Sequence, residues 1–133
     1  FPTTEMVFDP KYNLVDYLLS PAQVSPLVTA QAEAIAESPH LQNLEILTIN
    51  HNEIGDDGAV ALANTPNLPN LTHLSLFGNV VGDRGARALA ESPMSKKYIK
   101  LDLYKNQYTK DGIKALTESP NLKNCEELEI YRE

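Results

Sequence analysis

The side chains best suited to catalysis or metal binding in this chain are His40, His51, His73 and Cys125. None has the spacing of a zinc protease, a serine hydrolase, a phosphate-binding loop or a cysteine–histidine pair. His51 and His73 can lie close together on neighbouring strands, but no third metal ligand accompanies them. The sequence therefore predicts no catalytic residues, no metal site and no cofactor, and it favours surface histidines.

Three aromatic residues, Phe77, Tyr104 and Tyr131, stand 27 residues apart. Tyrosine and phenylalanine provide large contact areas at low entropic cost and are favoured at binding hot spots. On one exposed column they would form a protein-binding surface. The alternative is that they merely cover a sheet, because aromatic residues favour β-strands in any case.

The same step of 27 relates many other positions of the chain. It connects Leu47, Leu74, Leu101 and Leu128; Asn52, Asn79 and Asn106; Gly58, Gly85 and Gly112; and Pro39, Pro66, Pro93 and Pro120. A fixed period of this length is the signature of stacked structural repeats. The aromatic column therefore has to be placed on a repeat architecture.

Each repeat predicts a short strand followed by a helix. Residues 71–79 alternate apolar and polar side chains, which is typical of a strand with one buried face. Residues 80–92 carry Asp83 as a candidate helix cap and apolar residues at helical spacing, and Pro93 prevents continuation of the helix. We predict strands within 44–49, 71–76, 98–103 and 125–130, and helices over about 57–64, 84–91 and 111–118.

Strand–helix–strand units in series require right-handed crossovers and stack their strands into one parallel sheet. Neighbouring strands lie about 4.8 Å apart, whereas packed helices need roughly 8–10 Å. The stack must therefore bend. We predict an α/β solenoid, a right-handed β-α superhelix with its parallel sheet on the concave side and its helices on the convex side.

The motifs of these repeats carry a family resemblance. The stretches "LTHLSLFGN" (71–79) and "IKLDLYKN" (99–106) match the leucine-rich-repeat pattern L-x-x-L-x-L-x-x-N. The continuation G-D-x-x-G-x-x-x-L resembles the ribonuclease-inhibitor-like subclass, which has a helix in every repeat. The resemblance covers about residues 28 to 133, and it implies one partial repeat, about three full repeats and an incomplete last one.

The resemblance also implies roles for particular positions. Asn52, Asn79 and Asn106 are expected to hydrogen-bond the backbone of the turn after each strand, which is a structural role. Tyr98 and Cys125 replace the first leucine of the strand, and Glu133 stands at the asparagine position. Because that strand position points into the core, we expect Cys125 to be buried and inert.

Residues 1–27 do not follow the repeat, and we predict that they form an N-terminal cap. Ser25 and Pro26 are a good start for a helix longer than the later ones. At the other end the sequence stops within a predicted strand. Such an uncapped edge either invites pairing or signals truncation, and a first residue other than methionine suggests either a processed product or a segment cut from a longer chain.

Outward-facing strand residues repeat as columns on the predicted concave face. The third column holds Ile46, His73, Lys100 and Glu127, the fifth Thr48, Ser75, Asp102 and Glu129, the seventh Asn50, Phe77, Tyr104 and Tyr131, and the eighth His51, Gly78, Lys105 and Arg132. Gly78 would leave the Phe77 ring accessible. The candidate binding residues are Phe77, Tyr104, Tyr131, Asn50, His73, Lys100, Asp102, Lys105, Glu129 and Arg132. Their charges can instead pair across strands without any partner.

Composition limits the remaining classes of function. A net charge of −7 and a pI near 4.9 disfavour nucleic-acid binding, which needs clustered basic residues. The charge mildly favours a basic partner, although solubility alone is the stronger explanation. No apolar run is long enough to span a membrane, so we expect a soluble chain. A single cysteine allows no internal disulfide, which favours the cytoplasm, with a secreted effector as the alternative.

Two functions fit these observations. The first is a protein–protein interaction module that binds its partner through the concave sheet face. The second is a spacer or regulatory repeat segment of a larger enzyme, receptor or effector. An enzyme in its own right, or a site for a small-molecule substrate, would need a pocket, and an open sheet of about four strands provides only a shallow groove.

Overall fold

The computed structural model describes residues 4–8 and 29–130 of the chain. Two of the candidate binding residues, Tyr131 and Arg132, lie outside the described residues, and so does the helix start predicted at Ser25. The structural statements below concern the described residues.

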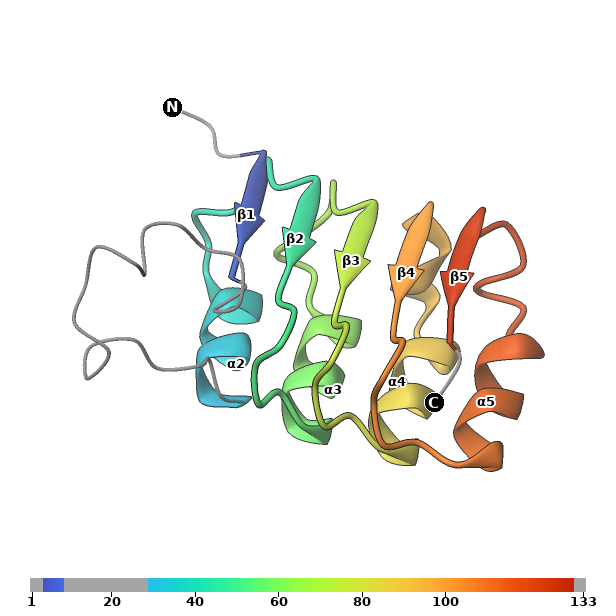
Figure 1. Cartoon of the computed structure of the whole chain (residues 1–133). Helices are drawn as coiled ribbons and strands as arrows, with labels where there is room; N and C mark the ends of the chain where they lie inside the picture. Colours follow the sequence, from blue (N-terminus) through green and yellow to red (C-terminus); the bar gives the residue numbers. More distant parts are fainter. Residues whose placement is uncertain (1–3, 9–28, 131–133) are drawn as a thin grey trace.

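The sheet has five parallel strands in the order β1-β2-β3-β4-β5 (Figure 1). They are β1 (Glu5–Val7), β2 (Ile46–Thr48), β3 (His73–Ser75), β4 (Lys100–Asp102) and β5 (Glu127–Glu129). Each of the four predicted strand segments contains one of these strands. Because neighbouring strands are also neighbours in sequence, every connection returns the chain to the next position in the stack.

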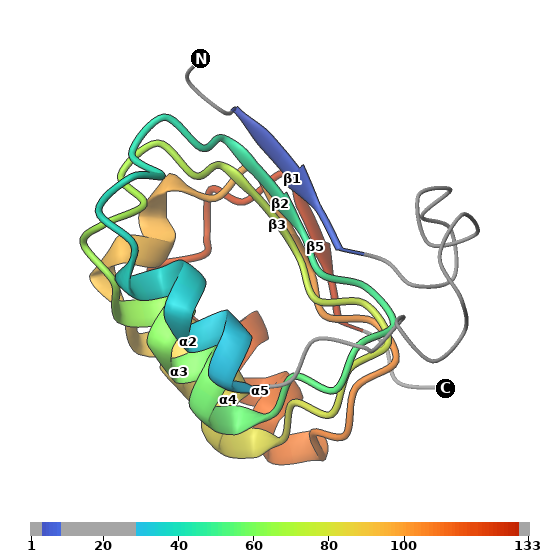
Figure 2. The ribbon, with the colours of Figure 1, turned by 90° about the vertical axis from the view of Figure 1, so that its left-hand side faces the viewer.

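The helices form one layer on one side of the sheet (Figure 2). They are α2 (Thr29–Glu37), α3 (Asp56–Asn64), α4 (Asp83–Glu91) and α5 (Lys110–Thr117), with a short 3-10 helix, η2 (Pro93–Lys97), after α4. The three predicted helices agree with α3, α4 and α5 to within one residue at each end. The strand–helix solenoid is therefore confirmed. The sheet face turned away from the helices is called the concave face below.

The core lies between the two layers and repeats from unit to unit. Leu47, Leu74 and Leu101 are in register on adjacent strands and fully buried. The helices contribute small residues such as Ala59 and Ala86, also fully buried. Small side chains at these positions allow neighbouring helices to pack closely.

The strand β1 was not predicted. Met6 lies opposite Leu47 in the sheet, and the backbone N–H of Phe8 donates to the carbonyl of Thr48 at 2.6 Å. Residues 8–28 separate β1 from α2, whereas only residues 49–55 separate β2 from α3. This longer connection hides the period of 27, so the sequence pattern indicated about four strands where the structure has five.

The asparagine column has the structural role that the resemblance implied. The Asn79 side-chain amide donates to the carbonyls of Ile49 at 2.6 Å and Leu76 at 3.0 Å, and its oxygen accepts from the backbone N–H of Ile54 at 3.0 Å. Asn106 makes the equivalent bonds one repeat later, and both side chains are buried. Each asparagine thus satisfies the backbone of two repeats in a place that water does not reach.

Asp83 was expected to cap its own helix, and this prediction is wrong. Helix α4 begins after Gly82 without a side-chain cap. The Asp83 carboxylate instead accepts from the backbone N–H groups of Thr109 at 2.7 Å and Gly112 at 3.0 Å, at the start of α5. The hydrogen bond from the Thr109 hydroxyl, together with these two backbone hydrogen bonds, lowers the pKa of Asp83.

Asp56 caps the start of α4 in the same way. Its carboxylate accepts from the backbone N–H groups of Gly82 at 2.7 Å and Gly85 at 2.9 Å. The approach requires glycine, because a Cβ on Gly85 would lie 2.7 Å from the Val81 side chain and 2.9 Å from the Asp56 carboxylate. Helices α4 and α5 are therefore each capped by an aspartate of the repeat before, which couples these repeats through the negative charge favoured at a helix start.

The helix ends are linked in a similar way. The Ser92 hydroxyl donates to the carbonyl of Ala63 at 2.6 Å, at the end of the preceding helix. Thr65 and Ser119 make the corresponding bonds to Ala36 and Ala90. The hydroxyl residue that precedes three of the repeated prolines thus satisfies a helix carbonyl of the neighbouring repeat.

Candidate functional site

The aromatic column lies on the concave face at the ends of β3 and β4. The rings of Phe77 and Tyr104 are stacked, with centroids 5.6 Å apart and planes inclined by 18°. Both side chains are half-buried. The structure therefore brings two of the three predicted aromatic residues together, at about the expected spacing.

The residues that follow the aromatic column share an unusual backbone conformation. His51, Gly78 and Lys105 have φ angles of 56°, 73° and 60°, in the left-handed region. The His51 ring packs edge-on to Phe77 at a centroid distance of 5.1 Å, and a Cβ on Gly78 would lie 3.0 Å from His51 Nδ1. Gly78 was expected to leave the Phe77 ring accessible. His51 packs against the ring edge-on, and the Phe77 side chain stays partly exposed.

Polar side chains fix the backbone at both aromatic residues. Asn50 Oδ1 accepts from the backbone N–H of Phe77 at 3.1 Å and from the Ser75 hydroxyl at 2.5 Å. Asp102 Oδ1 accepts from the backbone N–H of Tyr104 at 3.0 Å. Two residues of the predicted binding set therefore position the rings, a role that their exposed columns did not reveal.

The concave face has one ion pair between neighbouring strands and one pair of like-charged side chains in directly opposite positions. Lys100 Nζ lies 3.9 Å from a Glu127 carboxylate oxygen on the neighbouring strand. Two residues further along both strands, Asp102 lies opposite Glu129. Burial raises the pKa of Asp102, and the charge of Glu129 adds to this shift, while the hydrogen bond from Tyr104 and the charge of Lys100 oppose it.

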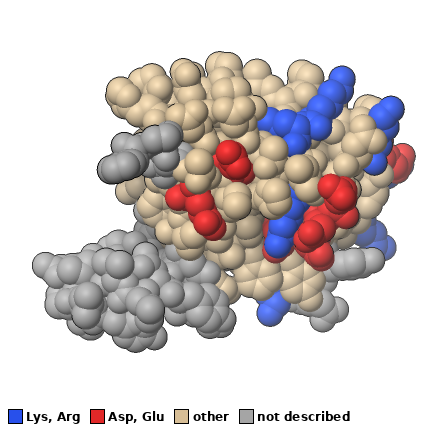
Figure 3. Space-filling view, turned by 90° about the horizontal axis from the view of Figure 1, so that it is seen from above, with Lys and Arg blue, Asp and Glu red and all other residues tan. Residues whose placement is uncertain are grey.

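The two ends of the solenoid differ in charge. Residues 29–83 contain no lysine or arginine, whereas residues 84–130 contain nine. In Figure 3, basic side chains gather toward the end of the stack that carries β4 and β5. On the concave face, the outward residues of β2 and β3 are the uncharged side chains of Ile46, Thr48 and Ser75, together with His73, whose Nδ1 lies 2.9 Å from the Thr72 hydroxyl.

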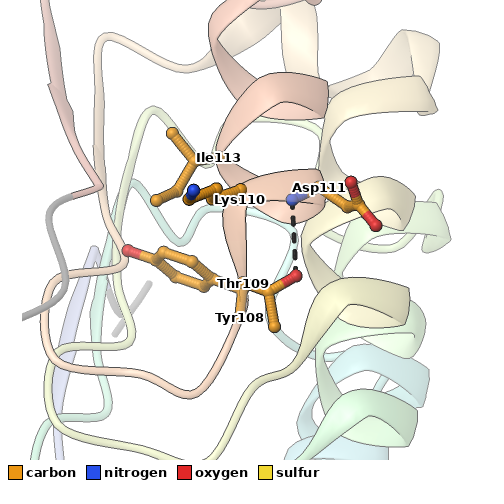
Figure 4. A pocket seen from close by; sticks show the side chains of 5 residues that line it. All are labelled: Tyr108, Thr109, Lys110, Asp111 and Ile113. Carbon is orange, nitrogen blue, oxygen red and sulfur yellow. Dashed lines mark hydrogen bonds between the residues drawn. The ribbon is translucent and has the colours of Figure 1, made fainter.

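An open pocket of about 570 Å³ lies at the start of α5, and the sequence did not predict it (Figure 4). Its lining residues are Tyr108, Thr109, Lys110, Asp111 and Ile113. The Thr109 hydroxyl is used within the helix start, where it accepts from the Asp111 backbone N–H at 3.3 Å and donates to Asp83 at 2.6 Å. Tyr108 is fully buried and donates to the Leu103 carbonyl at 2.8 Å. The lining therefore serves the packing and capping of α5.

Cys125 is half-buried rather than fully buried as expected. Its Sγ lies 3.4 Å from the Ile99 carbonyl oxygen, and burial raises the pKa of the thiol. Leu71 and Tyr98, at the equivalent positions of the two preceding repeats, are buried because the next repeat packs beside them. Among the described residues, β5 is the last strand of the sheet, so no further repeat covers Cys125. A raised pKa keeps the thiol protonated, which is consistent with low reactivity.

The described residues contain no cluster of three or more histidine, cysteine, aspartate or glutamate side chains that could hold a metal ion. Within the same residues, no helix has the length and apolar character needed to cross a bilayer.

Two segments of the chain, residues 40–63 and 67–90, match the family model described as Leucine Rich repeat. Each matched segment contains one strand and nearly all of the helix that follows it, β2 with α3 and β3 with α4. A comparison with curated proteins gave no match. The matched segments and the five-stranded parallel stack together show that the chain carries leucine-rich repeats and folds as a leucine-rich-repeat solenoid.

Proposed function

We propose that this chain is a protein-binding module that contacts its partner through the concave face. Leucine-rich repeats generally mediate protein–protein interaction. The observation that carries the proposal is the stacked pair of Phe77 and Tyr104, which is half-exposed on an open sheet face. Half-exposed aromatic side chains are typical anchors of protein interfaces.

The surroundings of the two rings support this role. Their backbone is held by Asn50 and Asp102, and the rings restrict each other by stacking. A surface that is ordered before binding loses less entropy when the complex forms. The polar residues around it, His73, Lys100, Lys105 and Glu129, would form the rim, and Tyr131 and Arg132 remain candidates from the sequence.

Another protein suits this face better than a small molecule. The contact surface is a sheet, and the pocket at α5 has its threonine hydroxyl committed to helix capping. Small-molecule sites usually enclose most of the ligand and present converging polar groups. The proposed binding needs no cofactor and no metal.

The test uses a partner obtained by unbiased capture with this chain. Tyr104→Ala should weaken the complex by about 1–3 kcal/mol while the circular dichroism spectrum stays unchanged. Arg87→Ala and Lys114→Ala, on the exposed helix surface, are the controls and should have almost no effect. Loss of binding in the two helix variants, with Tyr104→Ala unaffected, would move the site to the convex side. Failure to capture any specific partner would favour a spacer or regulatory segment.

A further inference from the structure

The loop between α4 and β4 departs from the equivalent loops of the other repeats, which connect the helix layer to the starts of the strands (Figure 2). Two positions are constant in the other three loops, which have Leu41, Leu68 and Leu122 at one and Asn43, Asn70 and Asn124 at the other. This loop has Ser95 and Lys97 instead, and it forms the 3-10 helix η2. The departure serves either local packing or a function that belongs to this loop.

Packing accounts for the change at Ser95. Tyr98, three residues later, stands where the preceding repeat has Leu71, so a larger side chain partly compensates for the smaller one. Both residues are buried, and the Ser95 hydroxyl donates to the Leu89 carbonyl at 2.5 Å. The core therefore explains this part of the departure.

Packing does not account for the charge of Lys97. Asn70, at the equivalent position, donates to the Gln42 carbonyl at 2.7 Å, and Lys97 Nζ donates to the Leu68 carbonyl at 2.6 Å. An uncharged amide can thus satisfy a loop carbonyl from this position. Lys97 is half-buried, and burial lowers the pKa of its ammonium. The lysine therefore carries an electrostatic cost that asparagine would avoid.

Lys97 lines an open groove of about 370 Å³ between this loop and the loop before it. The other lining residues are Thr65, Pro66, Pro69, Pro93, Met94 and Lys96. The prolines have a fixed φ angle, and methionine is an adaptable apolar side chain that is common at binding surfaces. The groove therefore combines apolar walls with two lysines, and none of its lining residues is acidic.

A second groove, at the ends of α4 and α5, carries the opposite charge. Its volume is about 360 Å³, and its lining includes Glu91 and Glu118 but no lysine or arginine. Glu91 is the acidic residue nearest to the η2 loop in sequence, and it belongs to this second groove. The ion pairs among the described residues involve neither Lys96 nor Lys97. The chain thus places two unpaired lysines in one groove and two glutamates in the next.

We propose that the groove between residues 65–69 and 93–97 is a second contact surface, which binds a segment of a partner protein carrying an acidic side chain next to an apolar one. The carboxylate would lie at Lys96 and Lys97 and offset the cost of the half-buried ammonium, while the apolar side chain would pack on the prolines and Met94. A net charge of −7 disfavours a nucleic acid as the source of the anion. An open groove would also leave a small carboxylate mostly in solvent, whereas a protein segment extends beyond it.

The experiment selects random peptides displayed on phage that bind the chain, and it removes those that also bind the variant M94N/K97N. This variant gives the loop the residue types of Asn67 and Asn70 in the preceding repeat, so the fold should be kept, which circular dichroism checks. We expect the remaining peptides to share an acidic residue beside an apolar one. Replacement of that acidic residue by its amide should weaken binding of the synthetic peptide at least about tenfold.

Two further variants separate the groove from net charge. K96Q/K97Q should also weaken binding at least about tenfold, because it removes both ammonium groups from the groove. The matched control is K110Q/K114Q, which removes the same charge from exposed positions of α5 and should change affinity less than about twofold. An equal loss in the control would reduce the effect to net charge and would overturn the proposed groove.

The remaining outcomes also decide the question. Selection that leaves no peptide after removal on M94N/K97N, or leaves peptides without a preference for acidic residues, would overturn the proposal. Tyr104→Ala should bind the selected peptides as the natural sequence does, because the groove contains no residue of the concave face. The result therefore stands or falls independently of the function proposed for Phe77 and Tyr104.

Discussion

The interior of the repeats and the concave face share the period of 27 residues. They differ in whether the same residue type recurs at equivalent positions. The buried position after each of three successive strands is asparagine, whereas the fifth column of the face changes at every step. That column reads Thr48, Ser75, Asp102 and Glu129. The difference has a physical cause: Asn79 and Asn106 each meet the same backbone donors and acceptors, while an outward side chain meets solvent. Repetition therefore reports the fold, and divergence marks where an individual function can be placed.

The largest expected effect lies in the leucine column. Leu74→Ala or Leu101→Ala should lower the free energy of unfolding by about 2–5 kcal/mol, because each side chain is fully buried between two layers. Urea denaturation measures this difference. Thr48→Ala, on the concave face, is the comparison and should stay within about 0.5 kcal/mol of the natural sequence. A leucine variant that falls in the same narrow range would show that the two surfaces are not as different as the structure indicates.

Substitution in the asparagine column should cause the next largest loss of stability. Asn79→Ala removes the acceptor for the Ile54 backbone N–H and the donor for two carbonyls, all in the protein interior. We expect a loss of about 1–3 kcal/mol in urea denaturation. Hydrogen exchange at Ile54 should accelerate in the variant. Unchanged exchange at this amide would mean that water replaces the side chain without cost.

Removal of a helix cap should lower the free energy of unfolding by a smaller amount, and the same column provides a control position. Asp56, Asp83 and Lys110 occupy one column, and the two aspartates cap the helix of the following repeat. Asp56→Ala should lower the free energy of unfolding by about 0.5–2 kcal/mol. Lys110→Ala changes the same column without removing such a cap and should stay within about 0.5 kcal/mol. Equal effects at both positions would contradict capping between repeats.

The buried columns of the repeats were easier to predict from the sequence than the concave face. The buried columns predicted four strands and three helices, because leucine, asparagine and proline report environments that recur in each repeat. The strand β1 escaped because the longer connection to α2 breaks the period. The cap formed by Asp83 was assigned to the wrong helix, since the sequence places this residue at a helix start but does not show how neighbouring helices are staggered.

The candidate site was predictable to a smaller extent. The spacing of 27 predicted that Phe77 and Tyr104 lie side by side on adjacent strands, and the structure adds that their rings stack. The edge-on contact of His51 was not predictable, since it depends on left-handed backbone at His51 and Gly78. The opposition of Asp102 and Glu129 could be read from their column. The partial burial that makes it costly could not.

The smallest expected effect concerns that acidic pair, and its sign depends on pH. The raised pKa of Asp102 means that the folded state binds this proton more tightly than the unfolded chain does. Its contribution to stability is therefore full below the ordinary pKa of an aspartate and is lost as the pH rises through the raised value. D102N keeps an oxygen that can accept from Tyr104 but carries no charge. Between about pH 3 and pH 7, its free energy of unfolding should improve relative to the natural sequence by less than about 1 kcal/mol, because solvent screens a half-exposed carboxylate.

A second variant separates the two causes of this shift. E129Q should move the pKa of Asp102 part of the way back toward its ordinary value, because it removes the neighbouring charge and leaves the burial of Asp102 unchanged. Carboxyl carbon NMR titration of Asp102 measures this directly. An improvement of the natural sequence relative to D102N with rising pH would show that the ionised carboxylate is already stabilised within the chain. The opposition of Asp102 and Glu129 would then carry no net electrostatic cost, and only its aromatic pair would distinguish the concave face from the rest of the sheet.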